Sequence, residues 1–158
     1  MPVINRGERF AIFGMGRVGT AAYHSLERSF PGRVIGFARD PVAVEAHREA
    51  ERNVTLADAT DSDFWERVCP ADDFDLVVLA MPTHSANVHA VGTLKRHDFK
   101  GVVAASGQFP KEIREFRNLG VDTAFNLYSH AGNHFAHHVI QVFFQQRPEL
   151  SVAWQIDE

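Results

Sequence analysis

Residues 10–19 join a short apolar run to a glycine-rich segment, Phe10-Ala11-Ile12-Phe13-Gly14-Met15-Gly16-Arg17-Val18-Gly19. The apolar run predicts a buried strand, and the pattern over residues 17–28 predicts a helix directly after it. In the spacing G-x-G-x-x-G the first glycine allows a tight turn, the second gives a pyrophosphate access to the backbone, and the third lets helix and strand pack closely. The free N–H groups and positive dipole end of the helix favour a phosphate. We therefore expect a nucleotide to bind along residues 14–19, the alternative being a turn of this shape without a ligand.

Short apolar runs and amphipathic stretches alternate along the rest of the chain, which is typical of βαβ units and a parallel sheet. Further strands are predicted at 34–37, 53–56, 76–80, 102–105 and 123–127. One helix is predicted to follow Asp40 as its N-cap, with Pro41 in its first position, and another to follow a cap at Asp61 or Ser62 and to run through Arg67. Further helices are predicted at 85–96, 110–119 and 131–144. The fold class is therefore α/β, a Rossmann-type doubly wound parallel six-stranded sheet of order 3-2-1-4-5-6 with helices on both faces. We expect this domain to span 1–145, with a C-terminal tail at 146–158.

Composition narrows the class of protein. The chain has 158 residues, of which 45% are hydrophobic and 23% charged, as in an ordinary soluble globular domain. We expect no direct membrane insertion and a cytoplasmic location, because no apolar run approaches about 20 residues and no signal-peptide core is visible. A net charge of −4 argues against nucleic-acid binding, and the single cysteine, Cys69, excludes an intrachain disulfide.

The second strand ends where the fingerprint calls for an acidic residue that holds the ribose hydroxyls. This sequence has Ala38 there, followed by Arg39 and Asp40. An arginine after a small residue suits a 2′-phosphate or stacking on an adenine. The alternative is that Arg39 is a solvated charge and Asp40 only a helix cap.

Several further motifs are shared with one family, and the chain resembles the TrkA-N or RCK domain, the regulator of conductance of potassium, especially the version in Kef-like potassium/proton antiporters. The matching stretches are Phe13 to Gly19, Arg52-Asn53-Val54, Asp58-Ala59-Thr60-Asp61 with Phe64-Trp65, Leu79-Ala80-Met81-Pro82, Phe125-Asn126-Leu127-Tyr128, Ala131-Gly132 and Phe135-Ala136. Together they cover roughly residues 9–143.

The resemblance implies nucleotide sensing. In such domains an adenine nucleotide, usually NAD(H) but also AMP, ADP or ATP, lies across the glycine turn. Asp58, Ala59 and Thr60 would line the adenine end, and Ala80, Met81 and Pro82 would lie near the ribose and phosphates. The resemblance further implies a homodimer whose last helix crosses to the partner. Since no pore segment is present, a potassium channel or transporter would be a separate chain acting in trans.

The sequence departs from the family pattern at three positions. Ala38 stands where the family has Asp, Ala57 where it has Gly, and His130 where an acidic residue is common. The first two changes remove a ribose acceptor and narrow the room for the ligand. We therefore expect NADP(H) or AMP to be preferred over plain NAD(H), and no catalytic residues.

Histidines and aromatic residues mark the remaining candidates. His84 and Asn87 follow the fourth strand, where ligands bind in open α/β sheets, so His84 would touch a phosphate or cap the next helix. A row of histidines shares one face of the last predicted helix: His130, His134, His137 and His138. This face suits a solvated surface, a dimer contact or, less well, a metal.

The opposite face of the same helix carries an apolar stripe, and residues 152–156 add a second apolar segment. We expect both to cover a partner chain in a homodimer, the alternative being a tail folded back on its own domain. The function that fits these features is a regulatory nucleotide-binding domain. A small NAD(P)-dependent oxidoreductase and an assembly domain without nucleotide remain alternatives.

Overall fold

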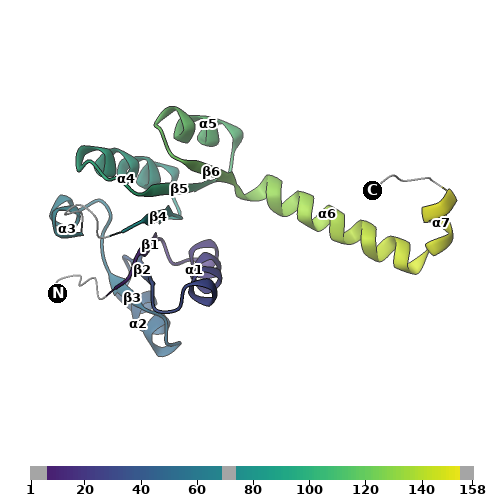
Figure 1. Cartoon of the computed structure of the whole chain (residues 1–158), viewed down its shortest axis with the longest axis horizontal. Helices are drawn as coiled ribbons and strands as arrows, with labels where there is room; N and C mark the ends of the chain where they lie inside the picture. The colour runs from purple at the N-terminus through teal and green to yellow at the C-terminus, as the bar shows by residue number, and fades with distance from the viewer. Residues whose placement is uncertain (1–6, 69–73, 154–158) are drawn as a thin grey trace.

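Within residues 7–68 and 74–153, which the computed structural model describes, six strands form one parallel sheet (Figure 1). They are β1 (Phe10–Phe13), β2 (Val34–Ala38), β3 (Val54–Leu56), β4 (Leu76–Leu79), β5 (Val102–Gly107) and β6 (Thr123–Asn126). Their order is β3-β2-β1-β4-β5-β6, and every neighbouring pair is parallel. The predicted fold class and strand order are confirmed. Because β1 lies between β2 and β4, the glycine turn opens at the point where the strand order reverses.

Helices cover both faces of the sheet. The connecting helices are α1 (Arg17–Ser29), α2 (Pro41–Glu49), α3 (Ser62–Val68), α4 (His84–Arg96) and α5 (Pro110–Asn118). One buried cluster joins the sheet to α1 and α2, and a larger one joins it to α3, α4 and α5. Strand β1 serves both clusters, since Ile12 faces the first while Ala11 and Phe13 face the second.

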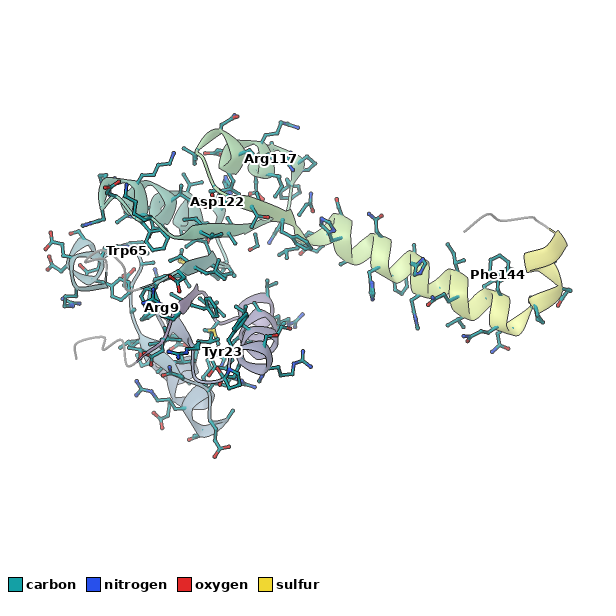
Figure 2. All side chains as sticks on the ribbon, in the orientation of Figure 1. Arg9, Tyr23, Trp65, Arg117, Asp122 and Phe144 are labelled. Carbon is teal, nitrogen blue, oxygen red and sulfur yellow. The ribbon has the colours of Figure 1, made fainter. Side chains whose placement is uncertain are left out.

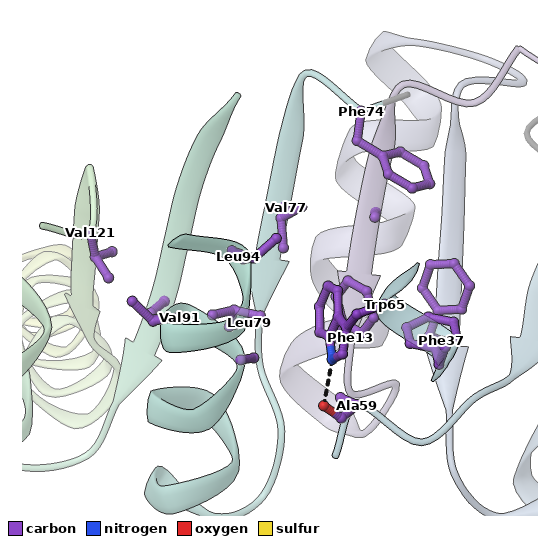
Figure 3. Packing of buried hydrophobic residues seen from close by; sticks show 14 of the residues in the cluster. Phe13, Phe37, Ala59, Trp65, Phe74, Val77, Leu79, Val91, Leu94 and Val121 are labelled. Atoms are coloured by element: carbon purple, nitrogen blue, oxygen red, sulfur yellow. Dashed lines mark hydrogen bonds between the residues drawn. The ribbon is translucent and has the colours of Figure 1, made fainter. Parts of the chain in front are cut away.

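The larger cluster is centred on stacked aromatic rings (Figure 3). Phe13 stacks on Phe37 and on Trp65, with ring centroids 4.8 Å apart in both pairs. The indole N–H of Trp65 donates to the Ala59 carbonyl at 2.6 Å, so the one polar atom of this buried ring is satisfied. This bond holds the segment after β3 against the core.

Short polar side chains cap the beginnings of α2 and α3 at the positions that the sequence predicts. Asp40 accepts a hydrogen bond from the Val42 amide at 3.0 Å, and Asp61 accepts one from the Asp63 amide at 3.0 Å. At α4 the cap is Thr83, whose hydroxyl accepts from the Ala86 amide at 3.3 Å. The alternative that His84 caps this helix was wrong, because a hydroxyl one residue earlier already satisfies the free amide.

The last helices differ from the prediction. The predicted helix at 131–144 is α6 (Leu127–Gln146), and it is followed by a short α7 (Pro148–Ala153). Helix α6 begins directly after β6 because Asn126 ends the strand and caps the helix by accepting from the Ser129 amide at 3.1 Å. Cys69 and residues 154–156 of the predicted apolar segment lie outside the described residues.

Helix α6 projects away from the sheet and carries α7 at its far end (Figure 1 and Figure 2). Its apolar stripe does not pack in the core of this chain, since Phe135 is 69% exposed and no residue of α6 is buried. Its 20 residues include no Asp, Glu, Lys or Arg. Even so, no helix in the described part of the chain has the length and apolarity needed to cross a membrane.

Replacing Trp65 tests the aromatic cluster. Trp65→Ala removes a side chain that is 1% exposed, together with its hydrogen bond, and should lower the free energy of unfolding by about 3–5 kcal/mol. Val42→Ala, at a side chain that is 76% exposed, should change it by less than about 0.5 kcal/mol. Urea denaturation of both variants measures the difference, and similar losses for the two would contradict the packing described above.

Candidate functional site

The glycine turn between β1 and α1 is shaped by two close backbone approaches. Gly14 has φ +99°, and a Cβ built there would lie 2.6 Å from the carbonyl carbon of Ala80, the residue directly after β4. A Cβ at Gly19 would overlap the carbonyl oxygen of Gly14. Both positions therefore require glycine for the fold itself.

Gly16 is different, because a Cβ placed there would meet no atom within 4 Å. The fold alone does not explain a glycine with open space beside it. Gly16 is also the N-cap of α1 and supplies no side-chain oxygen to the first turn of the helix. The first amide of α1 that bonds back to the turn is that of Thr20, which donates to the Gly16 carbonyl at 2.9 Å. The preceding amides have no acceptor within the helix and can donate to an anion.

A pocket of about 320 Å³ adjoins the turn. Its walls come from the glycine turn, the ends of β4 and β5, and the beginnings of α4, α5 and α6. The lining residues are Gly16, Arg17, Val18, Ala80, Met81, Pro82, His84, Asn87, Ser106, Gly107, Gln108, Glu112 and Leu127. The structure thus brings together two predicted groups, residues 16–18 and 80–82. Their joint position follows from the parallel sheet, in which the carboxyl ends of β1 and β4 meet at one edge.

Asn87 fixes the wall that follows β4. This side chain is 2% exposed, accepts from the Met81 amide at 3.1 Å, and donates to the Met81 carbonyl at 3.2 Å. Both backbone groups of Met81 are therefore held by one residue of α4. The sequence indicated Asn87 by its place after the strand, and the structure assigns it a supporting role.

His84 links the pocket to α5. Its Nε2 lies 2.8 Å from a carboxylate oxygen of Glu115, and its Nδ1 lies 3.7 Å from one of Glu112. The amides of Gln108 and Phe109 donate to Glu112 and, with the nearby His84 and Lys111, lower the pKa of its carboxyl group, against a smaller opposing effect of burial. Glu112 is therefore a fixed negative charge at the β5 side of the pocket.

The other predicted residues lie at the ends of β2 and β3. Asp58 accepts from the Thr60 hydroxyl at 2.6 Å and from its amide at 2.9 Å, and these bonds, with the nearby Arg39 guanidinium, lower the pKa of the Asp58 carboxyl group. Ala38 ends β2 in register with Leu56 of β3, and Arg39 is exposed beside it. This side of the turn therefore presents one cation and one carboxylate.

Three predicted site residues have side chains that stabilise the fold. Met15 is buried beneath Gly36, where its sulfur would lie 2.6 Å from any added Cβ, and Ala59 is buried under Trp65. Only the backbone of these two residues is available to a ligand. Asp40 caps α2, as the alternative interpretation of this residue expected.

Sequence reasoning missed the contribution of β5. Ser106, Gly107 and Gln108 follow or end this strand and line the pocket, together with Glu112 of α5. The signal was present, because the rule that placed ligands after the fourth strand applies to the fifth as well.

The histidines of α6 lie apart from this pocket. His130 stacks on Phe125 of β6 with centroids 3.9 Å apart, and His130, His134 and His137 line a shallow depression there. Among residues 7–68 and 74–153, no group of three or more His, Cys, Asp or Glu is arranged to hold a metal ion.

Comparisons with known proteins agree with this geometry. The TrkA-N domain family model matches residues 10–127, whereas no curated protein matches the sequence. Among solved structures, the NAD(P)-binding domain of an exopolyphosphatase-related protein from Archaeoglobus fulgidus superposes with a TM-score of 0.73 at 15% identity, over 85% of this chain and 98% of that one. The TrkA-N domain of the inner membrane protein ybaL from Escherichia coli gives a TM-score of 0.71 at 13% identity, over 85% and 98% of the two chains.

The Kef CTD of Shewanella denitrificans in its AMP-bound form gives a TM-score of 0.70 at 17% identity, over 86% of this chain and 81% of that one. At these identities the superpositions establish the shared fold, and the family model carries the assignment. The match spans the glycine turn, all six strands and the first residue of α6. This chain belongs to the TrkA-N domain family.

Proposed function

We propose that this chain is a regulatory domain that binds an adenine nucleotide with its phosphates on the glycine turn. The observation that carries the proposal is the open space beside Gly16, next to the uncapped beginning of α1. A side chain there would cost the fold nothing in steric terms, whereas a phosphate needs that space. The adjoining pocket gives room for a group beyond the phosphates.

The ligands of similar structures support an adenine nucleotide. The Shewanella denitrificans Kef CTD was solved with AMP, and the GsuK channel was solved with NAD and with ADP. For this chain we propose AMP or NADP(H) over NAD(H), because Ala38 offers no acceptor for ribose hydroxyls while Arg39 offers a cation. Arg39 is exposed and its guanidinium attracts the carboxylate of Asp58, so the two would flank the adenosine half of the ligand.

The regulatory part of the proposal concerns potassium transport. The neighbours include the Kef CTD and the GsuK channel, and this chain covers 23% of the NAD-bound GsuK chain. We propose that the domain acts in the cytoplasm on a potassium channel or transporter supplied as a separate chain. Nucleotide binding without oxidation or reduction of the nicotinamide would support this function, whereas turnover of NAD(P)H with a substrate would support the oxidoreductase alternative.

A second part of the proposal is a homodimer formed through α6. The exposed apolar side chains of this helix include Phe135, Val139 and Ile140, and the 20-residue helix lacks the charged residues that keep an isolated surface helix solvated. A second copy is an occupant of matching chemistry, because a two-fold axis would bring the same stripe from both chains together.

Gly16→Val tests the phosphate site. The branched side chain would fill the open space, so AMP binding measured by calorimetry should weaken by at least about tenfold, while the thermal unfolding midpoint without nucleotide should stay within a few degrees of wild type. Unchanged AMP affinity in a folded Gly16→Val protein would place the site elsewhere.

Arg39→Asp tests the choice of nucleotide. The new carboxylate can accept from ribose hydroxyls and repels a 2′-phosphate, so NADP(H) should bind more weakly and NAD(H) more tightly. Arg114→Asp, the same change on the exposed surface of α5, is the matched control and should alter neither affinity. If the two variants behave alike, Arg39 is not at the adenosine end of the ligand.

Sedimentation tests the dimer. Wild-type protein at tens of micromolar should sediment as a dimer, and Phe135→Glu should shift it to a monomer by placing a charge on the apolar stripe. Gln141→Glu adds the same charge among the histidines on the other side of α6 and should leave the dimer intact. A monomeric wild type, or a dimer that tolerates Phe135→Glu, would rule out this interface.

A further inference from the structure

The carbonyl group of Met15, within the glycine turn, accepts two hydrogen bonds from outside the turn. The hydroxyl of Thr20 on α1 donates to it at 3.1 Å, and Nε2 of His47 on α2 lies 2.9 Å from it. A peptide group is planar and trans, so fixing this carbonyl also fixes the N–H of Gly16, which points in the opposite direction. Gly16 borders the pocket. The direction of a turn amide is thus controlled from a helix that does not itself line the pocket.

His47 is in turn oriented by Arg52. The guanidinium Nη1 of Arg52 lies 3.2 Å from Nδ1 of His47, and its Nε donates to Nε2 of His24 on α1 at 3.1 Å. An arginine side chain donates hydrogen bonds and accepts none, so Nδ1 of His47 and Nε2 of His24 must both be acceptors. His47 is therefore neutral with its proton on Nε2, the tautomer that can donate to Met15.

The same arrangement connects three separate segments. His47 comes from α2, His24 from α1, and Arg52 from the connection between α2 and β3, where its own amide donates to the His47 carbonyl at 2.9 Å. The nearby titratable and charged groups are Tyr23 and Glu27 on α1 and Arg48 on α2. Tyr23 accepts from the Asn53 amide at 2.8 Å, and Arg48 donates to the Val54 carbonyl at 3.0 Å.

We propose that His47 is a positioning residue for the phosphate-binding turn and that Arg52 selects its working tautomer. The proposal rests on the proposed nucleotide site and deepens it. His47 does not touch the nucleotide but keeps the Met15–Gly16 peptide in the orientation that the phosphates require. Protonation of His47 would convert Nδ1 into a donor that faces the Arg52 cation, so acidification would break the arrangement and weaken nucleotide binding.

Two substitutions separate positioning from mere packing. A glutamine amide reaches about the position of the imidazole Nε2, donates there, and does not titrate. His47→Gln should therefore keep AMP affinity within about twofold of wild type at about pH 8, whereas His47→Leu should weaken it by about threefold to tenfold. His89→Leu, at an exposed histidine of α4 outside the pocket lining, is the matched control and should bind as wild type.

The pH profile is a readout that a purely structural role would not move. Between about pH 8 and about pH 5.5 wild-type AMP affinity should fall more steeply than that of His47→Gln, in which the titrating group is gone. Protonation of AMP itself affects both proteins equally. Parallel profiles, or wild-type affinity for His47→Leu, would overturn the proposal.

Nitrogen NMR of the ligand-free protein completes the test. Near pH 8 the His47 ring should carry its proton on Nε2, and an Nδ1–H tautomer would overturn the assignment to Arg52. Wild-type protein that binds none of AMP, NAD(H) and NADP(H) would overturn the proposed function and this inference with it. Binding by wild type together with unaffected His47 variants would overturn the inference alone.

Discussion

The close approach of Gly19 to the carbonyl of Gly14 is the constraint on which the rest of the site depends. It lets α1 start immediately beside the end of β1, so the helix points its free amides at the edge of the sheet where the strand order reverses. Gly14 makes a similar approach to the backbone of Ala80 and Met81, directly after β4. Gly14 and Gly19 are thus required by backbone packing, and this packing creates the open space beside Gly16.

The two sides of the turn differ in chemistry. On the β2–β3 side, the exposed Arg39 and the half-buried Asp58 present opposite charges. On the β4–β5 side, a pocket is lined by an asparagine whose side chain binds the Met81 backbone and by a histidine that lies between two carboxylates. A ligand that spans the turn would therefore meet charge recognition at one end and a shaped cavity at the other.

Much of this arrangement could be predicted from the sequence, because strand order in a doubly wound sheet follows from chain order and glycine spacing. The apolar run at β4 and the caps at Asp40 and Asp61 were local signals strong enough to place their elements. Side-chain partners across the fold had no such signal. His84 meets Glu115 31 residues later, and His47 meets Met15 32 residues earlier, and neither pair has a characteristic spacing.

The start of α6 was also beyond local signals. The β-prone residues Thr123 to Leu127 suggested a strand through Leu127, but Asn126 can end a strand and cap a helix at once. The apolar stripe of α6 could be identified by its period, yet its location outside the core depends on where the helix points. That direction is set by tertiary structure at Asn126.

Helix α6 also has a mechanical consequence. Its 20 residues extend about 30 Å from the sheet, and its first residue, Leu127, belongs to the pocket wall. A small rotation of the whole helix therefore moves its far end much further than it moves Leu127. A tilt of about 10° at the junction with β6 would move the far end of α6 by about 5 Å, so a change too small to alter the sheet would be large at α7.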